Sequence, residues 1–317
     1  MNFQVKVASI VAEATDIKSF EMVSVDGRPL PGFTAGSHID VQLSPTLIRQ
    51  YSLCNDPRER ERYVVAVKKE LKSRGGSLLM HELQPGEVVT ISEPRNNFHM
   101  TAAAEHTLLM AGGIGVTPLL AMARQLAGDG ASFHLHYFAR SKEHAAFRDV
   151  LNNGPFKGSA SFHYETDPAK VNTATREILS SRPEGAHLYL CGPLPFMDCV
   201  RKEAQAAWPA DTVHLEYFSV DEELLTRQRE RFQIRLANSS TVYEVPEDKT
   251  IVEVLAEQGI FIETSCEQGI CGTCVTRVLA GTPDHRDMYL TDEEKKACDR
   301  MMPCVSRALS PLLILEP

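Results

Sequence analysis

The feature of this sequence that most constrains its fold is a run of three cysteines with a fourth cysteine further along the chain. Cys266, Cys271 and Cys274 follow the spacing C-x4-C-x2-C, and Cys304 comes after a longer gap. Four thiolates at this spacing hold a [2Fe–2S] cluster. The spacing therefore predicts an iron–sulfur cluster with these four cysteines as its ligands.

Two glycines within the cysteine run support this interpretation. Gly269 and Gly272 allow positive φ, which turns backbone N–H groups toward the inorganic sulfides. A structural zinc site is the alternative. Zinc ligands usually occur as two separate close pairs in the sequence, whereas here a C-x4-C spacing overlaps a C-x2-C spacing. Disulfides are not expected, because no leader marks the chain for export. The other cysteines are Cys54, Cys191, Cys199 and Cys298.

Size and charge exclude several classes of protein. A chain of 317 residues is long enough for two or three domains. Its net charge of −9 argues against nucleic-acid binding, since phosphate recognition needs a basic surface. We recognise no signal peptide and no apolar run that could span a bilayer, so we expect a cytoplasmic protein without membrane contact. For the oligomeric state, a monomer is the default expectation.

The first third of the chain is predicted to be a small antiparallel β-barrel domain, residues 1–101. Short apolar or alternating runs separated by Gly and Pro turns are typical of such barrels. The predicted strands are Phe3–Ile10, Ser37–Leu43, Ile48–Leu53, Tyr63–Val67 and Glu87–Ile91, and one helix, Gly76–Leu83, interrupts them.

The rest of the chain divides into an α/β domain, a charged linker and the cysteine-containing domain. In residues 102–220 strands alternate with helical segments, which predicts a parallel sheet covered by helices on both faces. Residues 221–231 lack a sustained core face and are read as a linker. Residues 232–317 predict an α+β ferredoxin domain of the β-grasp kind, with one helix over Thr250–Gln258 that crosses its sheet.

A tetrapeptide at the end of a predicted barrel strand is a candidate flavin site. Alternation places Arg49 and Tyr51 on one face of the strand and Gln50 and Ser52 on the other. An Arg for a phosphate, an aromatic ring for a flat cofactor and a hydroxyl for a ring nitrogen together suit a flavin. A surface Arg beside a core Tyr is the alternative explanation of the same residues.

A second segment of the same domain is a candidate phosphate site. It consists of Arg74, Gly75, Gly76 and Ser77. Exposed N–H groups, the positive end of a helix dipole and an Arg side chain favour an anion there. A plain glycine turn with a Ser cap is the alternative. Val67 and Lys68, which lie between the two segments, complete the candidate cofactor contacts.

A glycine-rich turn in the second domain is a candidate pyrophosphate site. Its candidate residues are Gly112, Gly113, Gly115, Thr117 and Pro118. The glycines let the backbone approach a pyrophosphate, although Pro118 replaces the third glycine of the usual dinucleotide fingerprint. Cys191, Gly192 and Pro193 end another strand of the same sheet, so both motifs should face one crevice. Arg140 follows a further strand and leaves the choice between NADH and NADPH open.

The order of these motifs resembles the ferredoxin–NADP⁺ reductase superfamily with a fused plant-type ferredoxin domain, and more narrowly the phthalate dioxygenase reductase family. The resemblance covers essentially the whole chain, through Arg49–Ser52, Arg74–Ser77, Gly112–Pro118, Cys191–Pro193, Glu216–Phe218, Cys266–Cys274 and Gly281–Arg286. It implies FMN and NADH as cofactors beside the [2Fe–2S] cluster.

The resemblance also implies roles for individual residues. Arg49 and Arg74 would pair with the single phosphate of FMN, while Tyr51 would pack beside the ring system. The expected catalytic residues are Ser52 near flavin N5, Cys191 near the hydride path, Glu216, and Phe218 over the other flavin face.

As a function, the resemblance implies the reductase component of a multicomponent oxygenase or O-demethylase. Electrons would pass from NADH through FMN and the cluster, one at a time, to a terminal oxygenase of the Rieske non-haem iron type that docks transiently at the cluster loop. Candidates for steering this docking are Glu263, Glu267, Asp284 and Asp287, although a solvated charged surface explains these residues equally well. The main alternative is a stand-alone NAD(P)H-dependent flavin or quinone reductase with an accessory cluster. A metal-binding or redox-sensing protein without catalysis is a further one.

Overall fold

The computed structural model describes residues 2–45, 47–70, 75–102, 104–219, 225 and 230–316. The chain forms two compact units, Met1–Phe218 and Ser219–Pro317, and each unit is described by itself. Most of the predicted linker, and Arg74 of the candidate phosphate site, lie outside the described residues.

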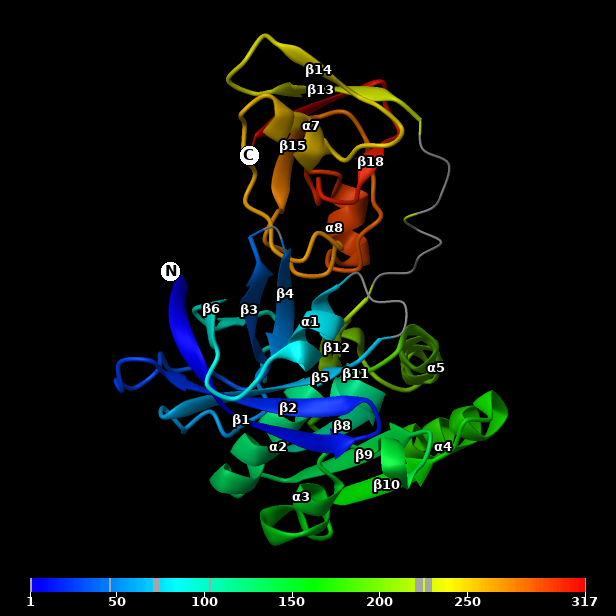
Figure 1. Ribbon diagram of the computed structural model, residues 1–317. Helices are drawn as coiled ribbons and strands as arrows, with labels where there is room; N and C mark the ends of the chain where they lie inside the picture. The colour runs from blue at the N-terminus through cyan, green and yellow to red at the C-terminus, as the bar shows by residue number, and fades with distance from the viewer. Residues whose placement is uncertain are drawn as a thin grey trace. The chain divides into compact units, whose positions relative to one another are not determined.

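The first part of unit 1 is an antiparallel barrel, as predicted (Figure 1). Its strands are β1 (Asn2–Ala14), β2 (Ile17–Ser24), β3 (Ser37–Ser44), β4 (Leu47–Ser52), β5 (Arg62–Lys68), β6 (Val88–Ser92) and β7 (Arg95–Asn96), with one helix, α1 (Gly76–Glu82). They pair in the order β4-β3-β6-β1-β2-β5, with β7 against β3. Leu53, directly after β4, bridges Val65 of β5, so the two ends of the sheet meet and close the barrel.

Alternating side chains of these strands fill the barrel. Val5, Phe20, Met22, Ile39 and Tyr63 are fully buried in one apolar cluster. Burying each such side chain contributes about 1.5–3 kcal/mol. Strand β2 was absent from the sequence prediction, yet it pairs with β1 and β5 and supplies two of these core residues.

The second part of unit 1 is a parallel sheet in the order β10-β9-β8-β11-β12. Its strands are β8 (His106–Gly112), β9 (Phe133–Ala139), β10 (Ala160–Tyr164), β11 (Ala186–Cys191) and β12 (Val213–Glu216). Its helices are α2 (Val116–Asp129), α3 (Arg148–Asn152), α4 (Pro168–Ser180) and α5 (Leu194–Gln205). The chain runs outward from β8 in both directions, so the strand order reverses between β8 and β11. Ligands of such sheets bind at this reversal, beyond the carboxyl ends of the strands.

Both faces of the parallel sheet are buried, as predicted. Leu109 of β8 packs with Leu120 of α2 in one apolar cluster. The neighbouring residue, Met110, points to the other face and packs with Leu179 of α4 and Val200 of α5. Alternate residues of one strand therefore serve two cores, which fixes β8 at the centre of the sheet.

Unit 2 is a mixed sheet crossed by one helix. Its strands are β13 (Phe232–Leu236), β14 (Val242–Val245), β15 (Thr276–Ala280), β16 (Pro283–Asp284), β17 (Arg300–Met301), β18 (Arg307–Ala308) and β19 (Leu312–Glu316), and its helices are α7 (Ile251–Glu257) and α8 (Asp292–Ala297). The main sheet has the order β14-β13-β19-β15-β17. Thr250 caps α7 in a capping box with Glu253, which explains why the helix begins there.

A buried guanidinium ties separate segments of unit 2 together. Arg307 is 4% exposed and donates hydrogen bonds to three backbone oxygens, those of Lys249, Glu230 and Pro246, each at 2.9 Å. It also lies 5.0 Å from the ring centre of Phe232. One side chain thus holds the start of β13, the end of β14 and the entry to α7.

Replacing Arg307 with Met should destabilise unit 2 selectively, because several part-buried carbonyl oxygens lose their charged donor. We expect a loss of about 2–3 kcal/mol in the free energy of unfolding of this unit. The measurement is a urea titration that follows the visible absorption of the cluster and flavin fluorescence separately. Only the cluster transition should move to lower urea. Arg277→Met, which removes an exposed pair with Glu316, should move neither transition, and a shift of both by Arg307→Met would contradict the assignment.

Candidate functional site

The glycine-rich turn after β8 lies against the motif that ends β11. A Cβ on Gly115 would stand 2.3 Å from the carbonyl oxygen of Cys191, and one on Gly112 would stand 2.7 Å from Cδ1 of Phe196. Neither contact leaves room for a side chain. The two motifs therefore lie against each other, and close packing of the backbone requires both glycines.

The turn leads into the N-terminus of α2. Gly115 is the N-cap and gives no side-chain cap, and the first turn holds no acidic residue. Thr117 is 2% exposed and its hydroxyl donates to the carbonyl oxygen of Ile114 at 3.0 Å, so it stabilises the turn. Pro118 is buried in the first turn, where its missing N–H costs no helical hydrogen bond. A helix start of this kind suits the pyrophosphate of a dinucleotide.

The register of the parallel sheet brings Cys191 beside Glu216. The two residues are partners at the carboxyl ends of β11 and β12. Cys191 is fully buried. Burial is the larger cause that raises the pKa of its thiol, and the nearby Glu216 carboxyl is the smaller one. The thiol is therefore neutral. It lies at the carboxyl end of β11, next to β8, where the strand order of the sheet reverses.

The carboxyl group of Glu216 links the parallel sheet to the barrel. Burial raises its pKa to about 8, although a hydrogen bond with Ser52 at the end of β4 acts in the opposite direction. The residue as a whole is half-buried, but its Oε2 is shielded from solvent and has no hydrogen-bond partner among the described residues. A buried polar atom without a partner is unfavourable, so this oxygen is a ready contact for a bound cofactor.

On the barrel side, Arg49 lies across the start of α1. A Cβ on Gly76 would stand 2.5 Å from Cγ of Arg49, and Gly75 precedes the helix with φ of 93° and no side-chain cap. Arg49 donates to the carbonyl oxygen of Ile48 at 2.8 Å. The hydroxyl of Ser77 accepts from the backbone N–H of Glu70 at 3.1 Å. Among the described residues, the two predicted phosphate segments therefore meet; Arg74 lies outside the described residues.

The other predicted flavin contacts are placed as follows. Tyr51 is half-buried against the barrel core, and burial raises the pKa of its hydroxyl. The amide of Gln50 lies 3.4 Å from Nε2 of His38, whose pKa is lowered to about 4 by burial. Val67 belongs to the barrel core, and Lys68 pairs with Glu70 at 2.7 Å. Their roles as cofactor contacts stay predictions.

The last two candidates, Phe218 and Arg140, lie in different surroundings. Phe218, the last residue of unit 1, is half-buried against the cluster that includes α2 and the centre of the parallel sheet. Arg140 is exposed after β9. Sequence reasoning missed Glu143, whose carboxylate accepts a hydrogen bond from Ser141 at 2.6 Å close to the same strand end. The sequence analysis considered only the positions directly at the end of β9, whereas Glu143 comes four positions after the last residue of that strand.

In unit 2 the four predicted ligand cysteines form two pairs. Sγ of Cys274 lies 3.2 Å from Sγ of Cys304, and the thiol of Cys266 hydrogen-bonds to Cys271. Hydrogen bonds within the pairs lower the pKa of Cys271 to about 5 and lower that of Cys274. Among the described residues no three metal-binding side chains converge on one point. Two pairs suit two irons with two thiolates each, whereas a single zinc ion needs its ligands around one point.

The loop around these thiols has the predicted conformation. Gly269 and Gly272 have φ of 72° and 77°, and a Cβ on them would stand 2.6 Å from Val305 and 2.3 Å from Tyr289. Backbone N–H groups of the loop reach the sulfurs, as in the contact of Gln268 N with Sγ of Cys266 at 3.3 Å. The residues present therefore fit a [2Fe–2S] cluster.

One expectation about docking is wrong. Asp287 is 1% exposed, and its carboxylate accepts hydrogen bonds from the N–H of Leu290 at 2.9 Å and the hydroxyl of Ser306 at 3.4 Å. A carboxylate bound inside the unit cannot steer a partner. The carboxylate of Asp284 is also bound within the unit, because it forms an ion pair with the buried Arg286 at 2.7 Å. Glu267 stays exposed at the cluster loop.

No helix of the described residues is long and apolar enough to cross a membrane.

The chain is similar to known proteins along its whole length. The 2Fe-2S iron-sulfur cluster binding domain matches residues 234–309. Vanillate O-demethylase oxidoreductase of Pseudomonas sp. strain HR199 is 44% identical, over 99% of both chains. Phthalate dioxygenase reductase of Burkholderia cepacia is 41% identical, over 99% of this chain and 97% of the relative.

Solved structures agree with these relatives. A structure of phthalate dioxygenase reductase, described as modular for electron transfer from pyridine nucleotides to [2Fe–2S], matches with a TM-score of 0.78 and 40% identity, over 100% of this chain and 98% of that one. An intact type IV self-sufficient cytochrome P450 monooxygenase matches with a TM-score of 0.85 and 36% identity, over 100% of this chain and 41% of that one. The barrel, parallel sheet and ferredoxin fold predicted from the sequence are thereby confirmed.

The raised pKa of Glu216 predicts a specific dependence of stability on pH. The folded chain keeps this proton up to about pH 8, whereas the unfolded chain releases it near the ordinary value of 4.5. The unfolded state therefore binds fewer protons between these values, and the contribution of Glu216 to the free energy of unfolding falls as pH rises from about 4.5 to about 8. Glu216→Gln removes this decline.

Urea unfolding at several pH values measures the effect. The Gln variant should match the wild type near pH 5 and become relatively more stable by pH 9. Glu203→Gln is the control, because the pKa of Glu203 is lowered by Arg176 and this variant should gain no stability at high pH. A constant difference between Glu216→Gln and the wild type across the whole range would contradict the buried, protonated carboxyl.

Proposed function

This chain belongs to the phthalate dioxygenase reductase family, and on that premise we propose that it delivers electrons from NADH, one at a time, to a terminal oxygenase of the Rieske non-haem iron type. It is an iron–sulfur flavoprotein oxidoreductase that uses FMN, NADH and a [2Fe–2S] cluster. The observation that carries the proposal is the pairing of the four cysteines in unit 2, in a chain whose other unit contains the candidate flavin and dinucleotide sites.

The geometry supports an assignment of residues to each cofactor. Arg49 and the start of α1 would hold the FMN phosphate, and Tyr51 would pack beside its rings. The turn at Gly112–Gly115 and the N-terminus of α2 would hold the pyrophosphate of NADH. When bound, FMN accepts a hydride from NADH and supplies single electrons to the cluster and thence to the acceptor.

Ser52 and Glu216 act as the proton store of this site. With a pKa of about 8, the Glu216 carboxyl carries a proton at neutral pH, and the hydroxyl of Ser52, which donates to this carboxyl, ties it to the barrel. The neutral Cys191 thiol beside it adds no charge next to the nicotinamide. These residues orient the reactants and hold a proton, while the redox chemistry belongs to the cofactors.

Glu143 supports the choice of NADH. Its carboxylate near the end of β9 suits the ribose 2′-hydroxyl of NADH and would repel the 2′-phosphate of NADPH. The exposed Arg140 acts in the opposite direction, so Glu143 is the residue whose removal should relax the preference.

The partner would dock transiently at the cluster loop, where Glu267 is exposed. Electron-transfer contacts are usually small, so we expect a weak and salt-dependent complex. A monomer suffices for the proposed activity, because one chain holds the candidate sites for both cofactors and the cluster. The alternative is a stand-alone flavin or quinone reductase. In that case the paired cysteines of unit 2 would take no part in the transfer of electrons to the acceptor.

Replacing Cys271 with Ser should separate the two halves of the activity. We expect electron transfer to cytochrome c or the oxygenase to fall by about a hundredfold or more, because the cluster loses a ligand. NADH-dependent reduction of a small dye should stay within about twofold, because FMN and NADH bind in the other unit.

Cys298→Ser is the matched control, since Cys298 lies in unit 2 and outside the two thiol pairs. It should leave both activities unchanged. Equal loss of dye reduction and cytochrome c reduction in Cys271→Ser would count against the scheme, and unchanged cytochrome c reduction would favour the stand-alone reductase.

A further inference from the structure

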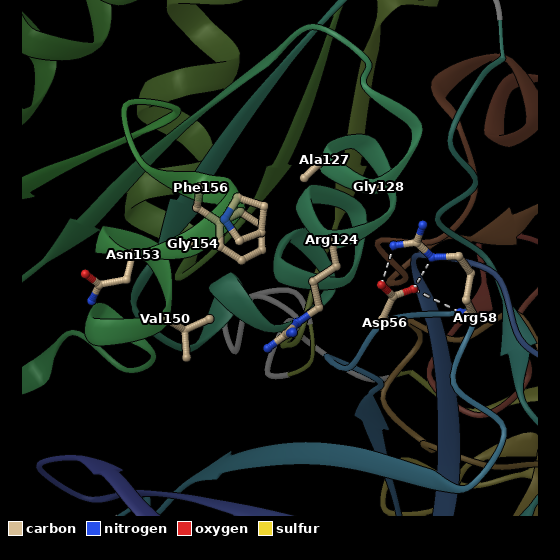
Figure 2. Close-up of a pocket in the computed structure, with 10 residues that line it drawn as sticks. Asp56, Arg58, Arg124, Ala127, Gly128, Val150, Asn153, Gly154 and Phe156 are labelled. Atoms are coloured by element: carbon tan, nitrogen blue, oxygen red, sulfur yellow. Dashed lines mark hydrogen bonds and ion pairs between the residues drawn. The ribbon is translucent and has the colours of Figure 1, made fainter.

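A pocket of about 430 Å³ lies on unit 1, between the loop after β4 and the C-terminal half of α2 (Figure 2). It is lined by Asp56, Arg58, Arg124, Ala127, Gly128, Val150, Asn153, Gly154, Pro155 and Phe156. None of these residues belongs to the predicted flavin or dinucleotide sites. The N-terminus of α2 carries the dinucleotide turn, whereas the pocket is built on the last two turns of the same helix.

The charges that line the pocket leave one positive charge in excess. The carboxylate of Asp56 accepts hydrogen bonds from Arg58 at 2.6 and 2.9 Å, so these two charges compensate each other. Arg124 makes no hydrogen bond and no ion pair with the described residues, and its Nε is buried without a partner. Its charge reaches Asp56 only as a weak Coulombic influence. The pocket therefore carries a guanidinium that lacks a counter-ion.

The Arg58 guanidinium of the Asp56–Arg58 pair lies against a helical glycine. A Cβ on Gly128 would stand 2.0 Å from Nη2 of Arg58, so the guanidinium lies directly on the backbone of α2. Glycine within a helix costs about 1 kcal/mol relative to alanine. Because Arg58 is paired with Asp56, its charge is compensated and adds no net positive charge to the pocket.

The other side of the pocket is apolar. Ala127 of α2, Val150 of α3, Pro155 and the buried Phe156 line it, and Val150 is 37% exposed. In the view of Figure 2 the Arg124 side chain descends from α2 between this apolar side and the Asp56–Arg58 pair. The amide of Asn153 is bound to the carbonyl oxygen of Asp149 at 2.6 Å, which leaves its oxygen as a neutral acceptor.

We propose that this pocket binds a small monocarboxylate with a flat apolar body, such as an arene carboxylate. The carboxylate would pair with Arg124, whose planar fork matches two oxygens, and the body would lie along Val150, Pro155 and Phe156. One unpaired positive charge suits a monoanion better than a phosphate, which carries more charge and needs more donors. The volume is within the range of natural ligand pockets, roughly 300–1,000 Å³.

Binding of benzoate to the full-length holoprotein tests the proposal. The titration is followed by ligand-observed NMR with saturating NAD⁺ present, so that anions do not enter the dinucleotide site. Benzamide removes the charge of the probe, and acetate removes its apolar body. Benzoate should bind saturably, and both of the other probes should bind at least about tenfold more weakly, because each lacks one of the two contacts.

Variants locate the binding. Arg124→Gln removes the charge and Val150→Trp fills the apolar side without touching Arg124, and each should weaken benzoate binding by about tenfold or more. Arg201→Gln makes the same change of charge on α5 and should bind benzoate as the wild type does. Unchanged flavin and cluster absorption shows that each variant is folded.

The proposal is overturned if the wild type shows no saturable benzoate binding, if benzamide binds as well as benzoate, or if Arg124→Gln binds benzoate unchanged. Should Arg124→Gln fail to fold, Val150→Trp and the two probe comparisons still decide. None of these results depends on electron transfer.

Discussion

The hydrogen bond between Ser52 and Glu216 is the contact on which the candidate site of unit 1 depends. It joins the last residue of β4 in the barrel to the last residue of β12 in the parallel sheet. A carboxyl group buried at this junction must be protonated or bound, and burial raises its pKa accordingly. The candidate flavin and dinucleotide segments are therefore linked by a group that can also hold a proton.

Close backbone packing fixes the rest of that junction. Gly115 lies against the carbonyl of Cys191, and Gly112 lies against Phe196, so the glycine-rich turn packs closely on the end of β11. The register of β11 with β12 then sets Cys191 beside Glu216. Three short motifs that are far apart in the sequence are thus brought to one edge of one sheet, which is where parallel sheets bind their ligands.

Much of this arrangement could be predicted from the sequence, because its signals are local. The spacing of the four cysteines, the positive φ of Gly269 and Gly272 and the glycine turn after β8 each follow from neighbouring residues. Features set by distant packing could not be found this way. The burial of Asp287 and the pairing of the thiols depend on tertiary contacts, and Glu143 reaches the end of β9 through a turn that strand patterns do not show. Strand β2 was missed because its apolar residues, Ile17, Phe20, Met22 and Val23, do not alternate regularly along the strand.

An anaerobic titration of the purified protein with NADH, followed by visible absorption, tests the central claim most directly. If electrons pass from NADH through FMN to the cluster, both the flavin band and the broader iron–sulfur band should bleach, with the electrons shared between the two centres. Bleaching of the flavin band alone would contradict the account, because the paired cysteines would then hold no cluster connected to the flavin. A spectrum that does not respond to NADH in fully loaded protein would contradict the whole assignment.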